Sequence, residues 1–457
     1  MSEIDQGQIN KNIRRGKNRT FNWKCAGCKT GVEVLRYLYE QNYTTTEILK
    51  TAEYVCRHFA DQDSFDEFLY VLGKLVFQPS QLCDYLEGSE AECEKPVCCI
   101  KKPKKGVPIK RKAGYWGTTA RCDIPFRTVE NLFEHINKSH KIDFILLSGD
   151  YVHHRDWEYT REDHISTIAN LSNLLQKHLP EIPIFWTLGN HEAVPVNSFG
   201  PDFVPEHFRP TWIYKAILAE AHKTDKGKLP VEADESSYAV DYGINLRLIA
   251  LNNGYCDSTN MFIYINQTDP DGSLTWLFVY ILSHIPPGDE DCLESWSRNY
   301  YRIVIRFEQI IRGQFFGHTH YDSFSLFFTD MNDRGSAPLS VLFTAPSVTT
   351  FEEVNPAYRI YIVNQNNWEI LDYETYFLNL SNTKNVNQSL PQWEFLYSAK
   401  KEYKLNDLSA SEWNELIKRI EKDPEIKRKF NRNYVRRNDE ICENKCMRKR
   451  LCSIQNI

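Results

Sequence analysis

The middle of the chain alternates short apolar runs with longer stretches of helical periodicity. Five short apolar runs are each followed directly by polar or glycine residues. They lie at 142–147, 183–188, 246–251, 276–282 and 314–316. Between the first two, Arg161–His178 places apolar residues on one side of a predicted helix, at Ile165, Ile168, Leu171, Leu174 and Leu175. This alternation of strands and helices predicts an α/β domain in which many strands pair in parallel. In such domains, ligands bind at the carboxyl ends of the strands.

The flanking segments differ from this middle part. Residues 22–88 predict a small helical unit, with helical spacing of Phe65, Phe68, Leu69, Leu72, Leu75 and Val76. That apolar face either packs into a core or presses onto a bilayer. Residues 89–114 are predicted to form a basic linker with cysteines, Pro and Gly, and the α/β domain is predicted to span 115–385. Residues 390–457 are predicted to form a helical, basic region with cysteines, in which the helical pattern begins at about 393.

Polar residues with metal-binding side chains follow the predicted strands. The first run is followed by Ser148-Gly149-Asp150, the second by Gly189-Asn190-His191-Glu192, the fourth by His284, and the fifth by Gly317-His318-Thr319-His320. Carboxylate, amide and imidazole groups suit a borderline divalent metal, zinc above all, with manganese or iron as alternatives. A single histidine is usually structural, but four such elements in order predict a metal site.

Composition and charge narrow the class of protein. The 457 residues are 42% hydrophobic and 25% charged, with 20 Gly and 20 Pro, which excludes a collagen-like or wholly disordered chain. No stretch approaches the ~20 apolar residues of a transmembrane helix. The net charge of −6 does not indicate a nucleic-acid partner. Protonation of all 13 histidines would change it to +7, so we expect binding to anionic lipids at acidic pH.

The 13 cysteines bear on the compartment. The pair Cys25 and Cys28 lacks a second pair at zinc-finger spacing, so disulfides in an oxidising compartment are favoured over structural zinc. Seven N-x-S/T sequons agree with this, and Asn266 and Asn379 are the candidates for glycosylation. The first 20 residues have no apolar signal-peptide core. Either the start is incomplete or the compartment is wrong, and we favour the first.

The ordered motifs resemble a known family. Gly-Asp, Gly-Asn-His-Glu, His and Gly-His-x-His, in that order, resemble the calcineurin-like metallophosphoesterases. The segments GYWGTTARCDIPFRT (114–128), SHIPPG (283–288), QFFGHTH (314–320) and APSVTT (345–350) resemble the acid sphingomyelinase branch. The resemblance implies a metallophosphoesterase β-sandwich flanked by helices, preceded by an all-α saposin-type domain over 22–88.

The resemblance also implies a reaction: a two-zinc site would hydrolyse sphingomyelin to ceramide and phosphocholine. Asp150 would bridge the zincs, Asn190, His284 and His318 would complete one site, and His320 would serve the other. His191 and His154 would be catalytic, stabilising the transition state and protonating the leaving alkoxide, although His154 also fits a surface residue. A Cys256–Cys292 disulfide is implied as well. The expected partners are a sphingomyelin-containing membrane or lipoprotein lipid, for a monomeric lysosomal or secreted protein.

One family motif is missing. Asp-x-His, expected upstream of Asp150, occurs nowhere in the 457 residues, and residues 81–88 join the saposin-like unit to sequence that normally follows the motif. One zinc would keep four ligands, whereas the other would have only Asp150 and His320, and catalytic zinc usually has three protein ligands. We therefore expect one zinc to bind well, the second weakly, and turnover to be slow.

Two alternatives stay open. The same site acting on nucleotides is one, and it is disfavoured by the saposin-like unit, which favours a lipid. The other is an inactive splice form or lipid-binding pseudoenzyme, which the missing Asp-x-His supports.

Overall fold

The computed structural model describes residues 114–156, 159–227, 237–243, 246–265, 280–383, 390–438, 442 and 444–455. The predicted saposin-type unit, nearly all of the 89–114 linker and the glycosylation candidate Asn266 lie outside these residues. Asn379 lies inside them and is half-buried at the end of a strand. The domain boundaries given above stay a prediction.

The largest sheet has six strands in the order β3-β4-β5-β6-β8-β7. Their bounds are β3 Tyr238–Tyr242, β4 Leu246–Ala250, β5 Tyr280–Leu282, β6 Gly313–Phe316, β7 Ser323–Phe328 and β8 Pro338–Thr344. The central strands β4, β5, β6 and β8 are parallel, and β3 and β7 pair antiparallel at the two edges. The predicted α/β class with parallel pairing is confirmed in these strands.

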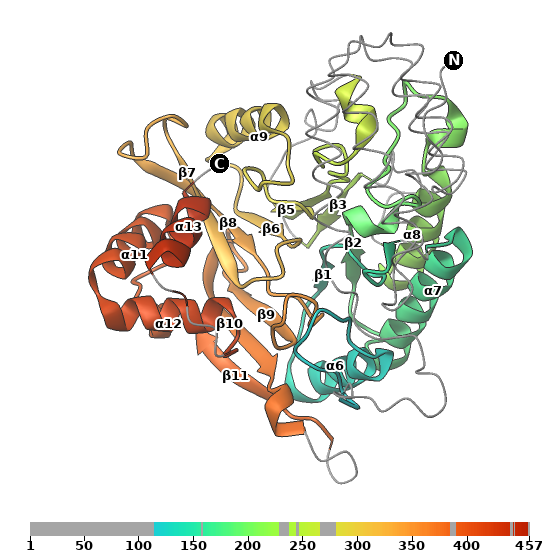
Figure 1. The fold of residues 1–457 in the computed structure, drawn as a ribbon, viewed down its shortest axis with the longest axis horizontal. Helices are drawn as coiled ribbons and strands as arrows, with labels where there is room; N and C mark the ends of the chain where they lie inside the picture. Colours follow the sequence, from blue (N-terminus) through green and yellow to red (C-terminus); the bar gives the residue numbers. More distant parts are fainter. Residues whose placement is uncertain are drawn as a thin grey trace, which may run out of the picture. The chain divides into compact units, whose positions relative to one another are not determined.

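A second sheet consists of two short parallel strands, which lie beside α7, Arg161–His178 (Figure 1). β1 (Ile145–Leu147) and β2 (Ile184–Trp186) are connected by α7, which has the predicted bounds. Thr160 caps α7 by accepting a hydrogen bond from the Asp163 amide. Ile168, Leu171 and Leu175 are buried, but Ile165 is 42% exposed, so the predicted apolar face begins one turn later than the sequence pattern suggested.

A third sheet forms the other layer. It contains β9 (Ala357–Val363), β10 (Ile370–Leu378) and β11 (Trp393–Ser398), all antiparallel. The aromatic rings of Phe315 on β6 and Phe343 on β8 contact Tyr361 on β9 at centroid distances of 4.8 and 5.8 Å, so the two sheets pack face to face. The expectation that the chain is helical from about 393 was wrong over β11, because that segment pairs with β10.

Helices enclose this sandwich. The remaining α-helices are α6 Phe126–Ser139, α8 Thr211–Thr224, α9 Glu294–Phe307, α10 Ala399–Tyr403, α11 Ala410–Lys422, α12 Pro424–Tyr434 and α13 Asn444–Ile454. Short 3-10 turns lie at η2 Asn190–Glu192, η3 Glu206–Phe208, η4 Met261–Tyr264 and η6 Leu380–Thr383. After β11, the C-terminal region is helical as predicted, and α11 and α13 pack on β7 (Figure 1).

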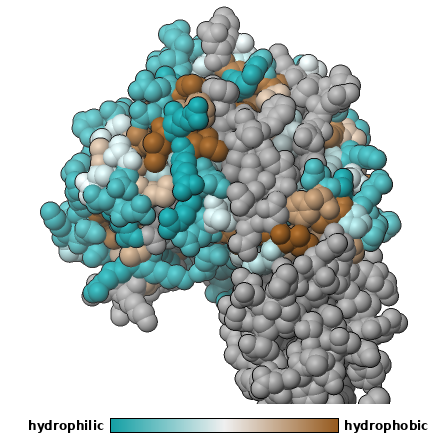
Figure 2. Space-filling model, turned by 90° about the horizontal axis from the view of Figure 1, so that it is seen from above, coloured by the Kyte–Doolittle hydropathy of each residue, from teal (hydrophilic) through white to brown (hydrophobic). Residues whose placement is uncertain are grey.

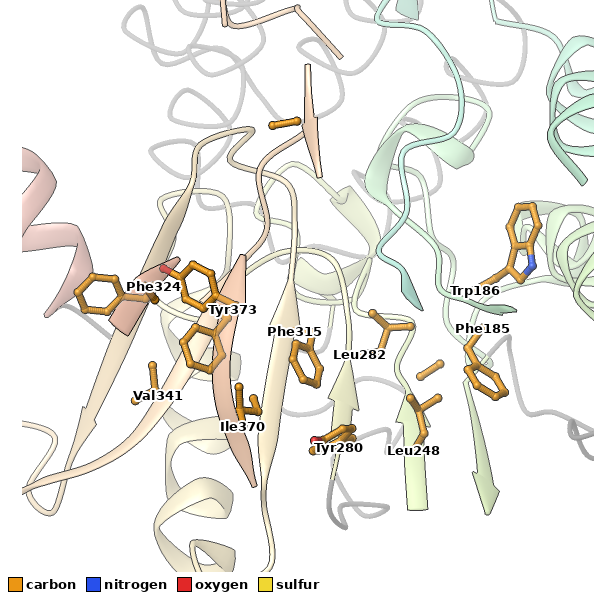
Figure 3. Packing of buried hydrophobic residues seen from close by; sticks show 14 of the residues in the cluster. Phe185, Trp186, Leu248, Tyr280, Leu282, Phe315, Phe324, Val341, Ile370 and Tyr373 are labelled. Carbon is orange, nitrogen blue, oxygen red and sulfur yellow. The ribbon is translucent and has the colours of Figure 1, made fainter. Parts of the chain in front are cut away.

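The core follows the alternation of side chains along the strands. One face of the six-stranded sheet carries Leu248, Tyr280 and Phe315 into the main cluster between the sheets (Figure 3). The opposite face packs Ile281 and Phe316 against α9. On the face of the molecule in Figure 2, hydrophobic residues occur in patches separated by hydrophilic ones. Among the described helices, none is both long and apolar enough to cross a membrane.

Candidate metal centre

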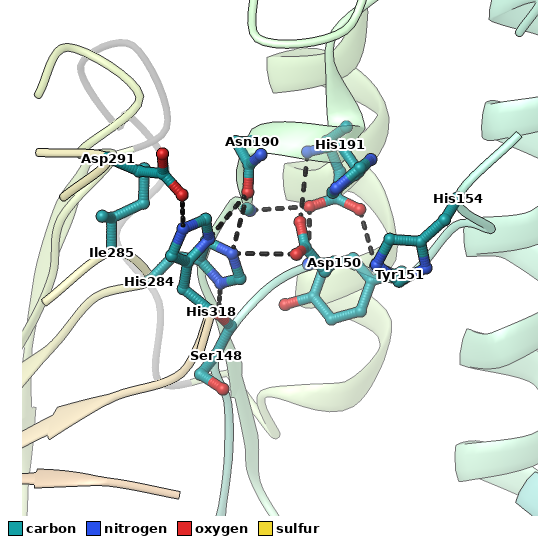
Figure 4. Close-up of polar contacts among 12 residues, drawn as sticks. Ser148, Asp150, Tyr151, His154, Asn190, His191, His284, Ile285, Asp291 and His318 are labelled. Atoms are coloured by element: carbon teal, nitrogen blue, oxygen red, sulfur yellow. Dashed lines mark hydrogen bonds and ion pairs between the residues drawn. The ribbon is translucent and has the colours of Figure 1, made fainter. Parts of the chain in front are cut away.

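The predicted ligands follow strands whose carboxyl ends meet. Asp150 lies three residues after β1, Asn190 begins the turn after β2, His284 follows β5, and His318 follows β6. Figure 4 shows these four side chains directed toward one another. The parallel strands thus bring together residues that are far apart in the sequence, as expected for this edge of an α/β sheet.

The ligand atoms of these residues converge. The Nε2 atom of His284 lies 2.9 Å from Asp150 Oδ2 and 3.1 Å from Asn190 Oδ1. The Nδ1 atom of His318 lies 3.2 Å from the same Asn190 oxygen. The ligand atoms of Asp150, His284 and His318 all lie within 4.8 Å of one another. A carboxylate, an amide oxygen and two imidazole nitrogens at such spacing fit one divalent cation.

Three of these four predicted ligands are oriented by a second contact. His284 Nδ1 faces the Ser148 carbonyl oxygen at 2.5 Å, so Nε2 faces the centre. The amide nitrogen of Asn190 donates to Asn197 Oδ1 at 2.9 Å, which turns its oxygen inward. His318 Nε2 contacts Asp291 Oδ2 at 3.0 Å. Such outer contacts typically orient metal-binding side chains, so the arrangement fits a metal site beyond the ligand types alone.

Electrostatics favour a positive charge at this position. Burial lowers the pKa of His318, but the hydrogen bond with Asp291 and the charges of Asp289 and Asp150 raise it to about 9. Burial raises the pKa of Asp150, but the histidines around it hold that pKa well below its usual range. A cation bound here would have to displace the proton of His318, so its affinity would increase with pH.

Two glycines allow the strand ends to approach each other. Gly149 has φ +93°, and a Cβ there would lie 2.4 Å from the amide nitrogen of Gly189. A Cβ on Gly189 would lie 2.1 Å from Asp150 Oδ1. Any larger residue would displace the turn that carries Asp150, so these glycines are needed for the site geometry.

Glu192 holds the same two turns together through hydrogen bonds with their backbone amides. Its fully buried carboxylate accepts hydrogen bonds from the backbone amides of Gly189 at 2.6 Å, Asp150 at 2.8 Å and Tyr151 at 2.6 Å. Burial and the neighbouring charge of Asp150 raise the pKa of Glu192 to about 7. Glu192 therefore connects the loop after β1 to the loop after β2.

The two predicted catalytic histidines lie next to each other. The rings of His154 and His191 are 4.5 Å apart between centroids, and His154 stacks on Phe351 at 3.9 Å. His154 Nδ1 lies 2.7 Å from Asp123 Oδ1, and His191 Nδ1 lies 2.9 Å from the Tyr159 hydroxyl. His154 is buried, which argues against the alternative of a surface residue.

His320, the ligand predicted for the second metal, lies next to His154 and is not part of the cluster formed by Asp150, His284 and His318. The two rings are 5.2 Å apart between centroids, and His320 is buried. Within the described part of the chain, its Nδ1 atom is a buried nitrogen with no hydrogen-bond partner. Burial and the charge of His154 hold the pKa of His320 well below its usual range, so the ring is neutral. A neutral imidazole with an unpaired nitrogen fits a metal ligand.

Comparison with known proteins assigns the chain to a family. Residues 118–322 match the calcineurin-like phosphoesterase family, and residues 337–457 match the acid sphingomyelin phosphodiesterase C-terminal region. Sphingomyelin phosphodiesterase 1 of Caenorhabditis elegans is 43% identical over 389 residues, covering 81% of this chain and 68% of the relative. The chain belongs to the acid sphingomyelin phosphodiesterase family. The predicted family, metallophosphoesterase fold and class of metal-dependent phosphodiesterases are thereby confirmed.

Two other relatives show how much of a family member's length this chain matches. Human sphingomyelin phosphodiesterase is 37% identical over 395 residues, covering 81% of this chain but only 61% of the human protein. Sphingomyelin phosphodiesterase 2 of Caenorhabditis elegans is 29% identical over 549 positions, covering 97% of this chain and 88% of the relative. Because 549 positions exceed the 457 residues of this chain, that relative contains segments that this chain lacks.

A disulfide lies close to the centre. Cys256 and Cys292 are bonded, which is the pairing that the resemblance implied, and a second disulfide joins Cys442 to Cys446. The first bond connects the loop after β4 to the loop that carries His284 and Asp291. Disulfides were also among the expected features of the family, and the structure contains them.

Three residues of the centre were not singled out from the sequence. Asp123 contacts His154, Asp291 contacts His318, and Tyr159 contacts His191. Asp123 lies within the segment GYWGTTARCDIPFRT that carries the resemblance, so that segment was the available signal. Asp291 and Tyr159 had no comparable signal, because their roles depend on loop conformations.

Proposed function

We propose that this chain hydrolyses sphingomyelin to ceramide and phosphocholine, with activity reduced by the missing Asp-x-His motif. The convergence of Asp150, Asn190, His284 and His318 beside His154 and His191 is the observation that carries the proposal. The substrate is taken from the relatives, which are named sphingomyelin phosphodiesterases. In the reaction, a water oxygen bonds to phosphorus, the bond from phosphorus to the ceramide oxygen breaks, and a proton moves to that leaving oxygen.

Zinc is the metal that we propose. Asp150, Asn190, His284 and His318 would hold one ion, and Asp150 with His320 would hold a second. When bound, such ions polarise the phosphodiester and lower the pKa of water. Two protein ligands hold zinc poorly, so the site that contains His320 would be depleted.

His154 would protonate the leaving group, and His191 would bind the phosphate oxygens. Since His154 Nδ1 is engaged by Asp123, Nε2 is the atom available to donate a proton to the ceramide oxygen. Tyr159 similarly engages Nδ1 of His191 and leaves Nε2 for the phosphate oxygens. In each case the polar partner, Asp123 or Tyr159, holds the orientation of the imidazole ring and its tautomer.

The partners and the compartment follow from the same proposal. A sphingomyelin-containing membrane or lipoprotein lipid would supply the substrate, anionic lipids would aid binding at acidic pH, and the protein would act as a monomer. The two disulfides support an oxidising compartment, in keeping with a lysosomal or secreted protein.

A second candidate is a form with little or no activity that still binds lipid or one metal. The absence of Asp-x-His from the sequence favours it, because that motif would supply two ligands of the second metal. Both candidates predict zinc at the first site, and they differ in turnover.

The deciding experiment compares substrates and metals. The purified chain is assayed on sphingomyelin vesicles and on soluble nucleotide phosphodiesters, with and without added zinc. Hydrolysis of sphingomyelin that is stimulated by zinc and lost in His284→Ala supports the proposal. Hydrolysis of nucleotides alone would replace the substrate, and no hydrolysis of either at any zinc concentration would favour the inactive form.

A further inference from the structure

Arg436 is a buried arginine of the C-terminal region that contacts the backbone of His320. It lies two residues beyond α12 and is 0% exposed. Its guanidinium donates to the carbonyl oxygen of His320, to the carbonyl oxygen of Asn355 at 2.5 Å and to Ser347 Oγ at 3.2 Å. All three acceptors are uncharged. A buried guanidinium is costly unless its donors are satisfied, so this position is built around the side chain.

The contact with His320 matters because of that residue's backbone. His320 has φ +64°, in the left-handed region that non-glycine residues rarely adopt. Such a conformation persists when the surrounding structure holds it in place. The carbonyl oxygen of His320 accepts from Arg436 and from the Ser347 amide at 3.2 Å, so its direction is fixed from two sides.

Neighbouring residues extend the same connection. The amide of Asp322 donates to the Tyr434 carbonyl oxygen at 3.2 Å, and the rings of Tyr321 and Tyr434 stack at 4.6 Å. The end of α12 therefore contacts three consecutive residues of the loop that follows β6. This loop carries the imidazole of His320, whose Nδ1 atom has no hydrogen-bond partner in the described part of the chain, and the ring lies next to His154.

We propose that Arg436 is a positioning residue for His320, through which the C-terminal region controls occupancy of the weaker metal site. The inference rests on the proposed function for its metal, and it concerns a residue that touches neither substrate nor metal. Because Asp150 and His320 are the proposed ligands of that site among the described residues, displacement of His320 would leave Asp150 as the one proposed ligand. The other proposed site takes Asn190 and His284 from the loops after β2 and β5, so we expect it to depend less on this contact.

The matched control is Arg450 on α13. Arg450 is 9% exposed, donates to Asn431 and lies over the Tyr434 ring at 4.3 Å. Its substitution perturbs the same helical region without removing the hydrogen bond to His320. Arg436→Gln, Arg436→Lys and Arg450→Gln are therefore compared in the full chain, with thermal unfolding measured for each.

The test is zinc affinity measured by chelator competition, together with NMR of the histidine side chains in the zinc-free protein. We expect Arg436→Gln to weaken the weaker site at least ten-fold, to leave the tighter site within two-fold, and to shift or broaden the His320 resonance. Arg436→Lys should fall in between, and Arg450→Gln should leave both sites and the resonance unchanged. The proposal is overturned if Arg436→Gln is folded with unchanged zinc affinity and an unchanged His320 resonance. It is also overturned if Arg450→Gln produces the same changes.

Failure of the proposed function has a different signature. A wild-type chain that binds no zinc would contradict the metal proposal, whatever the variants do. The His320 resonance still tests Arg436 in that case, because the resonance is recorded without metal. An Arg436→Gln spectrum that differs from the wild type, with an Arg450→Gln spectrum that does not, would support the positioning role alone.

Discussion

The pair formed by Asp123 and His154 makes the sharpest prediction about catalysis. Asp123 accepts from the His154 amide at 2.9 Å, from His154 Nδ1 at 2.7 Å and from Thr349 Oγ1 at 2.9 Å. Burial opposes its ionisation, but the hydrogen bond and charge of His154 outweigh burial and lower its pKa to about 2. Asp123→Asn keeps the shape and removes the charge.

The magnitude follows from that pKa. The difference between a pKa of about 2 and the ordinary 3.8 corresponds to roughly 2 kcal/mol in favour of the ionised carboxylate. The folded pKa is depressed, so this stability is fully present above pH 3.8 and is lost as the pH falls toward 2. If His154 donates the proton to the leaving oxygen, the same interaction stabilises its imidazolium. We expect kcat on sphingomyelin to fall about 30-fold in Asp123→Asn.

The assay separates proton transfer from damage to the fold. A p-nitrophenyl phosphodiester has a leaving group that needs no proton, so Asp123→Asn should lose less than about 3-fold on it. Thr349→Val removes one hydrogen bond from the same carboxylate and keeps the His154 contact, so it serves as the control. Equal losses on both substrates would refute the role of His154 as a proton donor, and so would an unchanged kcat on sphingomyelin.

Three further predictions concern the site and the surface. Gly149→Ala should abolish zinc binding and cost about 3 kcal/mol of stability in denaturant unfolding, because its Cβ would lie 2.4 Å from the Gly189 nitrogen; retained zinc would contradict this. Glu192 has a pKa raised from 4.5 to about 7, so its contribution is present below pH 4.5 and lost as the pH rises through 7. The zinc-free protein should therefore unfold at a lower temperature at pH 8 than at pH 5, with a smaller difference in Glu192→Gln. Binding to anionic vesicles should be stronger at pH 5 than at pH 7 in a flotation assay, because histidines become charged; equal binding would reject it.

Local patterns predicted several of the elements and placed the candidate ligands after strands. The helix Arg161–His178 was predicted with its observed bounds, because its apolar residues recur at helical spacing. Asp150, His284 and His318, which are predicted ligands, lie together in the structure because each follows an apolar strand and parallel strands end at one edge. The strand β11 was missed because it runs directly into α10, so its apolar residues resemble the start of the helical tail, whereas they pair with β10.

Residues that support the ligands were harder to predict. Asp123 and His154 are 31 positions apart, Asp291 and His318 are 27 apart, and Arg436 and His320 are 116 apart. None of these pairs lies at a spacing that a helix or strand imposes. They are brought together by loops whose backbone includes left-handed residues such as His318 and His320. Periodicity carries no information on such contacts.

We propose that this chain has one metal site with four protein ligands and a second, depleted site. The direct measurement is zinc content per chain by mass spectrometry after dialysis against metal-free buffer, with sphingomyelin hydrolysis measured on the same sample. The account predicts about one retained zinc, held by Asp150, Asn190, His284 and His318, and slow turnover that rises with added zinc. Two zinc ions retained per chain, with turnover that added zinc does not change, would contradict it.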